Sequence, residues 1–128
     1  VQFIMMKLNK NETVIMNNYG KRYLYSGKVE KKDPLWVYES KHLIESLKKY
    51  DKGPNAPDIM AISLYDKKTE EVAAFEELVG SHGGIGGPQS FPFILYPNKF
   101  EGPKEDIVGA ENVYTVLKGW LKMYSVKG

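Results

Sequence analysis

The sequence has no cysteine, no long apolar run and almost no net charge, and each absence excludes a class of protein. Without cysteine the chain forms no disulfide, offers no thiolate to a metal and has no cysteine nucleophile. No run approaches the about 18 apolar residues that a membrane span requires, so we expect no span within this chain. A formal charge of +2 on 128 residues gives no general attraction to nucleic acid.

The charged residues are distributed as on a solvated surface. Lysines are interleaved with acidic residues along 28–33, 48–51 and 66–71. The basic and aromatic stretch Lys21–Tyr25 would suit base stacking, yet alternation along a strand explains the same residues as one packed and one wet face. We therefore expect no nucleic-acid partner.

Length and composition indicate one ordinary domain over residues 1–128, with 42% hydrophobic residues to build its core. The chain starts at Val1 inside a β-prone run and without an initiator methionine. We expect it to be a piece of a longer protein. The missing N-terminal portion of the same polypeptide would then be its first partner.

The first residues predict an antiparallel meander. Two β-prone runs, Gln2–Leu8 and Thr13–Asn17, are separated by a short polar stretch, as in a hairpin. Lys21–Ser26 follows as a third strand of the same kind. The N-terminal part of the sheet is therefore expected to be antiparallel.

A helix and a buried strand are expected next. Asp33 would cap the helix, with Pro34 in its first turn, and Gly53 would end it. After a turn-rich stretch, the short apolar run Asp58–Tyr65 is typical of a strand covered on both faces. We expect this strand to be central in the sheet.

The second half adds two helices and one strand. Glu70–Val79 has apolar residues at helical spacing and acidic residues in its first turn. Phe91–Tyr96 is expected to be a strand, and Ala110–Tyr124 is a last amphipathic helix. The whole pattern predicts an α/β fold: a mixed β-sheet with an N-terminal antiparallel meander and about three packing helices.

The segment Ser81–Gln89 has four glycines in the five positions after its histidine. Glycine lets the backbone approach a ligand, a metal or another chain closely. His82 is the residue in this segment able to do chemistry, because an imidazole is a good ligand for zinc or manganese. The candidate site residues are His82 as metal ligand and, in a glycine-rich active-site loop, Ser81, Gly83, Gly84, Gly86, Gly87 and Gln89.

Spacing alone leaves the role of this segment open. A catalytic zinc usually takes three protein ligands, and no histidine or cysteine motif lies near His82. Phosphate-binding glycine loops lead from a strand into a helix, whereas the order predicted here is reversed. Ser81 lacks the strained elbow of serine hydrolases and would also serve as an ordinary hydroxyl at a helix end. No catalytic residue is assigned from the pattern.

Four stretches carry a resemblance to a known family: Tyr65-Asp66, Glu70–Gln89, Pro92–Pro97 and Ile107–Ala110. The most specific part is Ser-His-Gly-Gly-x-Gly-Gly with its flanking Phe-Glu-Glu-Leu-Val and Gln-x-x-Pro-Phe. With these four stretches, the chain resembles the C-terminal part of bacterial type I phosphodiesterase/nucleotide pyrophosphatase-like proteins of the alkaline phosphatase superfamily. The resemblance extends over nearly the whole chain.

The resemblance implies one lobe of a metal-dependent phosphohydrolase, a fragment of a larger alkaline-phosphatase-like fold, in which His82 binds one of two divalent ions, zinc or manganese. In that superfamily the Ser or Thr nucleophile and most other ligands precede this segment. No Asp-His-Gly motif occurs in the chain. We therefore expect the isolated chain to be inactive, and its parent to be a bacterial hydrolase with an N-terminal membrane part.

A different class of function stays open beside this one. In a non-catalytic binding or self-assembly module, the glycines would only let the Ala74–Val79 helix and the Phe91–Tyr96 strand pack closely. A lobe taken from a larger fold would also expose strand edges and apolar surface. We therefore expect self-association into a homo-oligomer through exposed edges.

Overall fold

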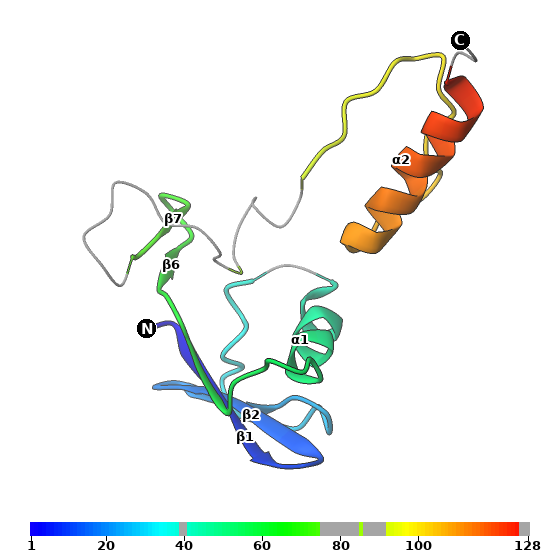
Figure 1. The fold of residues 1–128 in the computed structure, drawn as a ribbon. Helices are drawn as coiled ribbons and strands as arrows, with labels where there is room; N and C mark the ends of the chain where they lie inside the picture. The colour runs from blue at the N-terminus through cyan, green and yellow to red at the C-terminus, as the bar shows by residue number, and fades with distance from the viewer. Residues whose placement is uncertain (39–40, 75–84, 86–91, 126–128) are drawn as a thin grey trace. The chain divides into compact units, whose positions relative to one another are not determined.

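The structure is a computed structural model that describes residues 1–38, 41–74, 85 and 92–125. The chain folds as two compact units, residues 1–92 and residues 93–128, and each is described by itself. In the described residues, the first unit contains two sheets and a helix, and the second contains one longer helix (Figure 1). The prediction of one domain over residues 1–128 stays a prediction.

Five antiparallel strands form the main sheet, in the order β4-β3-β2-β1-β5. Polar turns shape its start, because the Asn9 side chain accepts a hydrogen bond from the Asn11 N–H and the Asn17 side chain accepts one from the Tyr19 N–H. The predicted N-terminal antiparallel meander is confirmed. The strands are β1 (Phe3–Asn9), β2 (Glu12–Asn17), β3 (Gly20–Tyr23), β4 (Val29–Lys31) and β5 (Ile59–Ile62).

One face of the sheet packs against α1 (Leu43–Asp51). Met5 lies opposite Ile15 in the β1–β2 register, and both side chains are buried on this face. Leu43 and Leu47 meet them from α1, since residues four apart lie on one side of a helix. The same core cluster includes Phe3, Leu24, Leu35, Val37, Tyr38 and Tyr65.

The opposite face of the sheet is apolar over β1, β2 and β5, whereas on β3 and β4 it carries Lys21, Tyr23 and Glu30. We call the apolar part the open face and define it by its residues Ile4, Met6, Val14, Met16, Ile59 and Ala61. None of them belongs to the core cluster, and Ile4 is 38% and Ile59 62% exposed, although Val14 at the centre is buried. An antiparallel sheet that is wet on one side normally carries polar residues there. The open face therefore departs from the usual alternation.

The prediction of a central strand over Asp58–Tyr65 is wrong. β5 ends at Ile62 and, among the described residues, pairs only with β1, at one edge of the sheet. Its alternate residues Ile59 and Ala61 are exposed, so the strand is not covered on both faces. All pairs in the described sheets are antiparallel, where a mixed sheet was expected.

The helix expected from Asp33 starts later than predicted. Residues 34–37 form turns, and α1 begins only at Leu43. The Asp33 carboxylate accepts hydrogen bonds from the Arg22 guanidinium, with Nε at 3.0 and 2.9 Å from its two oxygens, and from the Leu35 N–H at 3.0 Å. Asp33 therefore ties a turn to strand β3 instead of capping a helix.

A second, two-stranded sheet occupies the start of another predicted helix. β6 (Tyr65–Asp66) pairs with β7 (Glu71–Val72). The helix prediction over Glu70–Val79 is therefore wrong at its beginning, and its remainder lies outside the described residues. Within the described part of the chain there are two helices, where about three were expected.

The second unit consists of α2 (Ala110–Tyr124), predicted with these bounds, and the segment before it. Trp120 is buried between aromatic rings, with its ring centroid 4.7 Å from that of Tyr96 and 5.6 Å from that of Phe100. The Trp120 indole N–H donates to the Glu101 carbonyl at 2.8 Å. These contacts hold the preceding segment along one side of α2.

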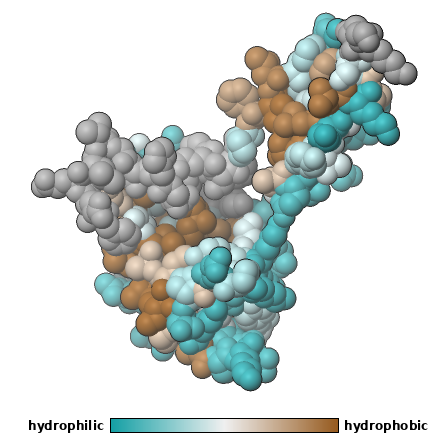
Figure 2. All heavy atoms as spheres, viewed as in Figure 1, coloured by the Kyte–Doolittle hydropathy of each residue, from teal (hydrophilic) through white to brown (hydrophobic). Residues whose placement is uncertain are grey.

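Part of the apolar surface of the second unit faces outward. Figure 2 shows apolar atoms along α2, where Leu117 is 46% and Leu121 60% exposed. The strand predicted over Phe91–Tyr96 is wrong within the described residues 92–96, which pair with no strand and leave Phe93 89% exposed. In the described part of the chain, neither helix has the length and apolarity that crossing a membrane requires.

Candidate functional site

The site predicted from the sequence lies almost wholly outside the described residues. The metal ligand His82 falls there, and so do the loop residues Ser81, Gly83, Gly84, Gly86, Gly87 and Gln89. Their predicted roles stay predictions. Ile85 is the one member of the segment that the structure describes. It is half-buried and packs against the core cluster of the first unit.

Within the described ranges, no three His, Asp or Glu side chains lie close enough together to hold a metal ion. The chain's other histidine, His42, directly precedes α1. Its buried Nε2 has no hydrogen-bond partner among the described residues. His42 is therefore placed at a helix start, in an environment distinct from a cluster of ligands.

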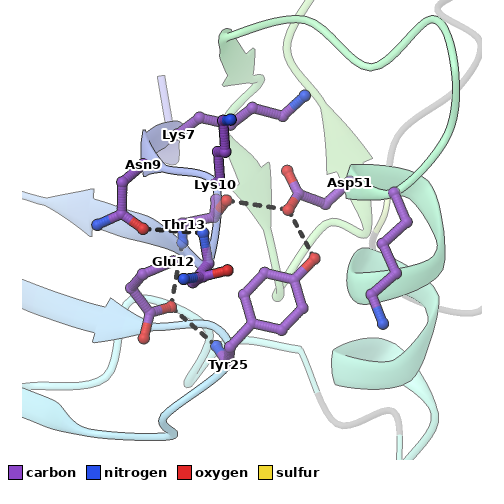
Figure 3. Close-up of a pocket in the computed structure, with 9 residues that line it drawn as sticks. Lys7, Asn9, Lys10, Glu12, Thr13, Tyr25 and Asp51 are labelled. Carbon is purple, nitrogen blue, oxygen red and sulfur yellow. Dashed lines mark hydrogen bonds between the residues drawn. The ribbon is translucent and has the colours of Figure 1, made fainter.

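A pocket of about 460 Å³ opens in the first unit, where the β1–β2 turn meets the C-terminal end of α1 (Figure 3). Its wall is made by Lys7 and residues 9–13 of the hairpin, by Tyr25 after β3, and by Asp51 and Lys52 at the end of α1. The strand pairing shifts here, because Lys7 pairs with Thr13 but Asn9 pairs with Glu12. Such irregularities widen a strand end, and the volume suits a small molecule.

Asp51 joins three elements at the floor of this pocket. Its Oδ2 accepts a hydrogen bond from the Thr13 hydroxyl at 2.9 Å and another from the Tyr25 hydroxyl at 2.8 Å (Figure 3). The residue is only 8% exposed, and its other oxygen, Oδ1, is buried without a partner among the described residues. A buried carboxylate oxygen without a donor is unfavourable. Asp51 therefore has capacity for one further hydrogen bond.

The Tyr25 phenol responds to this environment. Burial, the hydrogen bond to Asp51 and the negative charges of Asp51 and Glu12 raise the pKa of Tyr25 to about 12. The phenol thus stays protonated and donates to Asp51 throughout the neutral range. It is fixed as a donor to the protein and does not act as a base.

Glu12 is also occupied by the fold. Its carboxylate accepts hydrogen bonds from the backbone N–H groups of Thr13, Tyr25 and Ser26, at 3.0, 2.9 and 3.1 Å. Burial alone would raise the pKa of Glu12, but these hydrogen bonds together bring it below its usual value. Glu12 is therefore an ionised anchor for the chain after β3.

Among the described residues, the basic residues of the pocket form fewer hydrogen bonds than its acidic residues. The Lys7 ammonium donates to the Ala56 carbonyl at 3.1 Å, and the Lys52 ammonium lies 5.6 Å from the centre of the Tyr25 ring. Neither Lys10 nor Lys52 forms an ion pair with a described residue. The pocket thus offers free cationic donors beside carboxylates that the protein already uses.

This pocket was not predicted from the sequence, since its residues come from three separate segments. One local signal was present. Asp51 is the last residue of α1, where the helix dipole favours a cation and disfavours a carboxylate. An acid at that position indicates a partner elsewhere in the fold, here Thr13 and Tyr25.

Comparison of the chain with family models, curated proteins and solved structures found no match in any of the three.

Proposed function

We propose that this chain is the C-terminal lobe of a metal-dependent phosphodiesterase or nucleotide pyrophosphatase of the alkaline phosphatase type. The observation that carries the proposal is the segment Ser81–Gln89 in its flanking sequence. A histidine set among glycines suits a metal site that a phosphate ester must approach closely. The contact of Ile85 with the core cluster supports it, because one residue of this segment packs on the folded first unit.

In this function the chain supplies only part of a site. The His82 imidazole would be one ligand of a divalent ion, zinc or manganese, and the glycines would leave room for the phosphate ester. The nucleophile and the remaining ligands would come from the N-terminal portion of the parent protein. Bound metal ions would supply stabilisation of the attacking and leaving oxygens during in-line displacement. The isolated chain is then inactive.

The test compares two histidines in the parent protein. His82→Ala should abolish metal-dependent hydrolysis of a phosphodiester and lower the metal content measured by mass spectrometry. His42→Gln, which changes the chain's other histidine, should leave both nearly unchanged. If His82→Ala keeps the rate and the metal content of the unaltered parent protein, the proposal is rejected.

The isolated chain provides an independent check. A lobe that contributes a single ligand should bind zinc or manganese weakly, because stable sites need several donors. Calorimetric titration of the chain should therefore show no tight site. Tight stoichiometric binding by the chain alone would overturn the division of the site between two portions.

A second candidate is a self-assembly module, and the open face favours it. Exposed apolar residues on a sheet face that ought to be polar mark a surface for another protein. Ile4 and Ile59 are the clearest examples, at 38% and 62% exposed. This function needs no metal, so metal titration and sedimentation analysis together distinguish the two candidates.

A further inference from the structure

The pocket at the β1–β2 turn has an excess of hydrogen-bond donors over free acceptors. Glu12 accepts three backbone N–H groups, and Asp51 Oδ2 accepts two hydroxyls. The ammonium groups of Lys10 and Lys52 have no carboxylate partner in the described part of the chain. Two cations that form no ion pair with the carboxylates of their pocket attract an anionic group.

The helix end limits where an anion can lie. α1 ends at Asp51, and the C-terminal end of a helix repels negative charge. An anionic group is therefore favoured beside Lys10, on the hairpin side, and beside Lys52, whose own charge offsets the helix end. Beside the Asp51 carboxylate, the pocket favours a neutral group that donates a hydrogen bond.

Asp51 Oδ1 is the atom that such a donor would satisfy. It belongs to a side chain more than nine-tenths buried and has no partner among the described residues. A hydroxyl can donate to this oxygen and at the same time accept from a lysine ammonium. Because Oδ1 is closed to water, a hydroxyl that reaches it must displace the atoms that cover it.

We propose that this pocket binds a small phosphorylated polyol. Its phosphate lies beside Lys10 and Lys52, and one of its hydroxyls donates to Asp51 Oδ1. The pocket volume of about 460 Å³ is within the range of small-molecule sites. The proposal uses none of the residues Ser81–Gln89 and is independent of the hydrolase function.

The test uses sn-glycerol 3-phosphate as probe in an NMR titration of the chain at constant ionic strength. The backbone amides of Lys10, Asn11, Thr13 and Lys52 should shift, and these shifts give the Kd. Propyl phosphate, which keeps the phosphate but has no hydroxyl, should bind about tenfold more weakly, since a site that satisfies Oδ1 discriminates against it. This comparison uses the unaltered protein and does not depend on any variant folding.

Three pocket variants and one control on α2 assign the contacts. Lys10→Gln and Lys52→Gln should each weaken both phosphates about fivefold or more, whereas Lys122→Gln, the same charge change on α2, should not. Asp51→Asn should weaken glycerol 3-phosphate towards the affinity of propyl phosphate. Equal affinity of the two phosphates overturns the polyol assignment. The site is overturned if the backbone amides of the pocket do not shift on addition of the phosphates. It is also overturned if both pocket lysine variants bind the phosphates with unchanged affinity.

Discussion

Thr13 and Asp51, 38 positions apart in the chain, are joined by a hydrogen bond of 2.9 Å between the Thr13 hydroxyl and Asp51 Oδ2. Thr13 is 1% exposed in the central part of the sheet, and Asp51 ends α1. The Tyr25 hydroxyl donates to the same oxygen. One carboxylate therefore fixes the end of the helix to two segments of the meander.

Asp51→Ala should destabilise the first unit by about 2–3 kcal/mol. The substitution leaves the buried Thr13 hydroxyl and the Tyr25 hydroxyl without their acceptor, which costs more than the roughly 0.3–1 kcal/mol gained by removing an acid from a helix C-terminus. Urea unfolding followed by circular dichroism measures the difference. Asp58→Ala, at an exposed acid before β5, is the control and should stay within about 0.5 kcal/mol. Equal effects of the two substitutions would show that the hydrogen bonds contribute nothing.

The elements set by local pattern could be predicted from the sequence, and those set by distant partners could not. The β1–β2 hairpin and α2 follow from alternation, turn residues and helical spacing. The position of β5 at an edge depends on its pairing with β1, about fifty residues away, to which Asp58–Tyr65 gives no local clue. Apolar residues on both sides of this strand predicted that both of its faces are buried. In the structure, the apolar residues on one side belong to the open face and are exposed.

The same distinction holds for the candidate site. Asp33 before proline is typical of a helix cap, but Arg22 and the Leu35 N–H bind its carboxylate in a turn. The pocket depends on a contact between the end of α1 and Thr13 that no local pattern contains. The role of His82 rests on the sequence alone.

The Tyr25 phenol should lose its proton only at unusually high pH. Its pKa is raised to about 12 in the folded chain, against roughly 10 in an unfolded one. The sign follows from the shift: the stability that the protonated phenol contributes is fully present below pH 10 and is lost as pH rises through about 12. NMR of ¹³C-labelled tyrosine, with Tyr25→Phe to assign its signal, measures the pKa. Asp51→Ala should move it towards 10, and an unchanged value would remove Asp51 as a cause.

The Arg22–Asp33 pair should make stability depend on acid pH. Burial raises the pKa of Asp33, but the hydrogen bonds and charge of Arg22 and the Leu35 N–H bring it below its usual value. A lowered folded pKa gives stability that is present above the unfolded pKa of roughly 4 and is lost as pH falls through the folded one. Asp33→Asn should therefore cost about 1 kcal/mol at neutral pH and progressively less in acid. Unfolding in urea from pH 6 to pH 2 tests this, and a constant difference would contradict it.

Two glycine-to-alanine substitutions should have opposite signs. A Cβ at Gly20 would lie 2.1 Å from the Lys32 carbonyl oxygen and 2.5 Å from that of Glu30, so Gly20→Ala must push β3 and β4 apart. A loss of about 2 kcal/mol or more is expected. At Gly119 in α2 a Cβ meets nothing within 4 Å, and alanine should stabilise the helix by about 0.5–1 kcal/mol. Thermal unfolding of both variants measures the pair. If Gly20→Ala leaves the stability unchanged, β3 and β4 can move apart at little cost in free energy.

The open face should drive association of the chain with itself at high concentration. Ile4 lies on β1, which has a neighbour on each side, so Ile4→Lys changes the face without altering an edge of the sheet. A lysine there would have to lose its hydration when the face is covered, so self-association should weaken. Leu121→Lys, at an apolar and more exposed position on α2, is the control and should leave association unchanged. Sedimentation velocity over a concentration series, with circular dichroism to confirm folding, separates the outcomes. If Ile4→Lys still associates like the unaltered chain, the open face is not the contact. A chain that is monomeric at every concentration has no such contact.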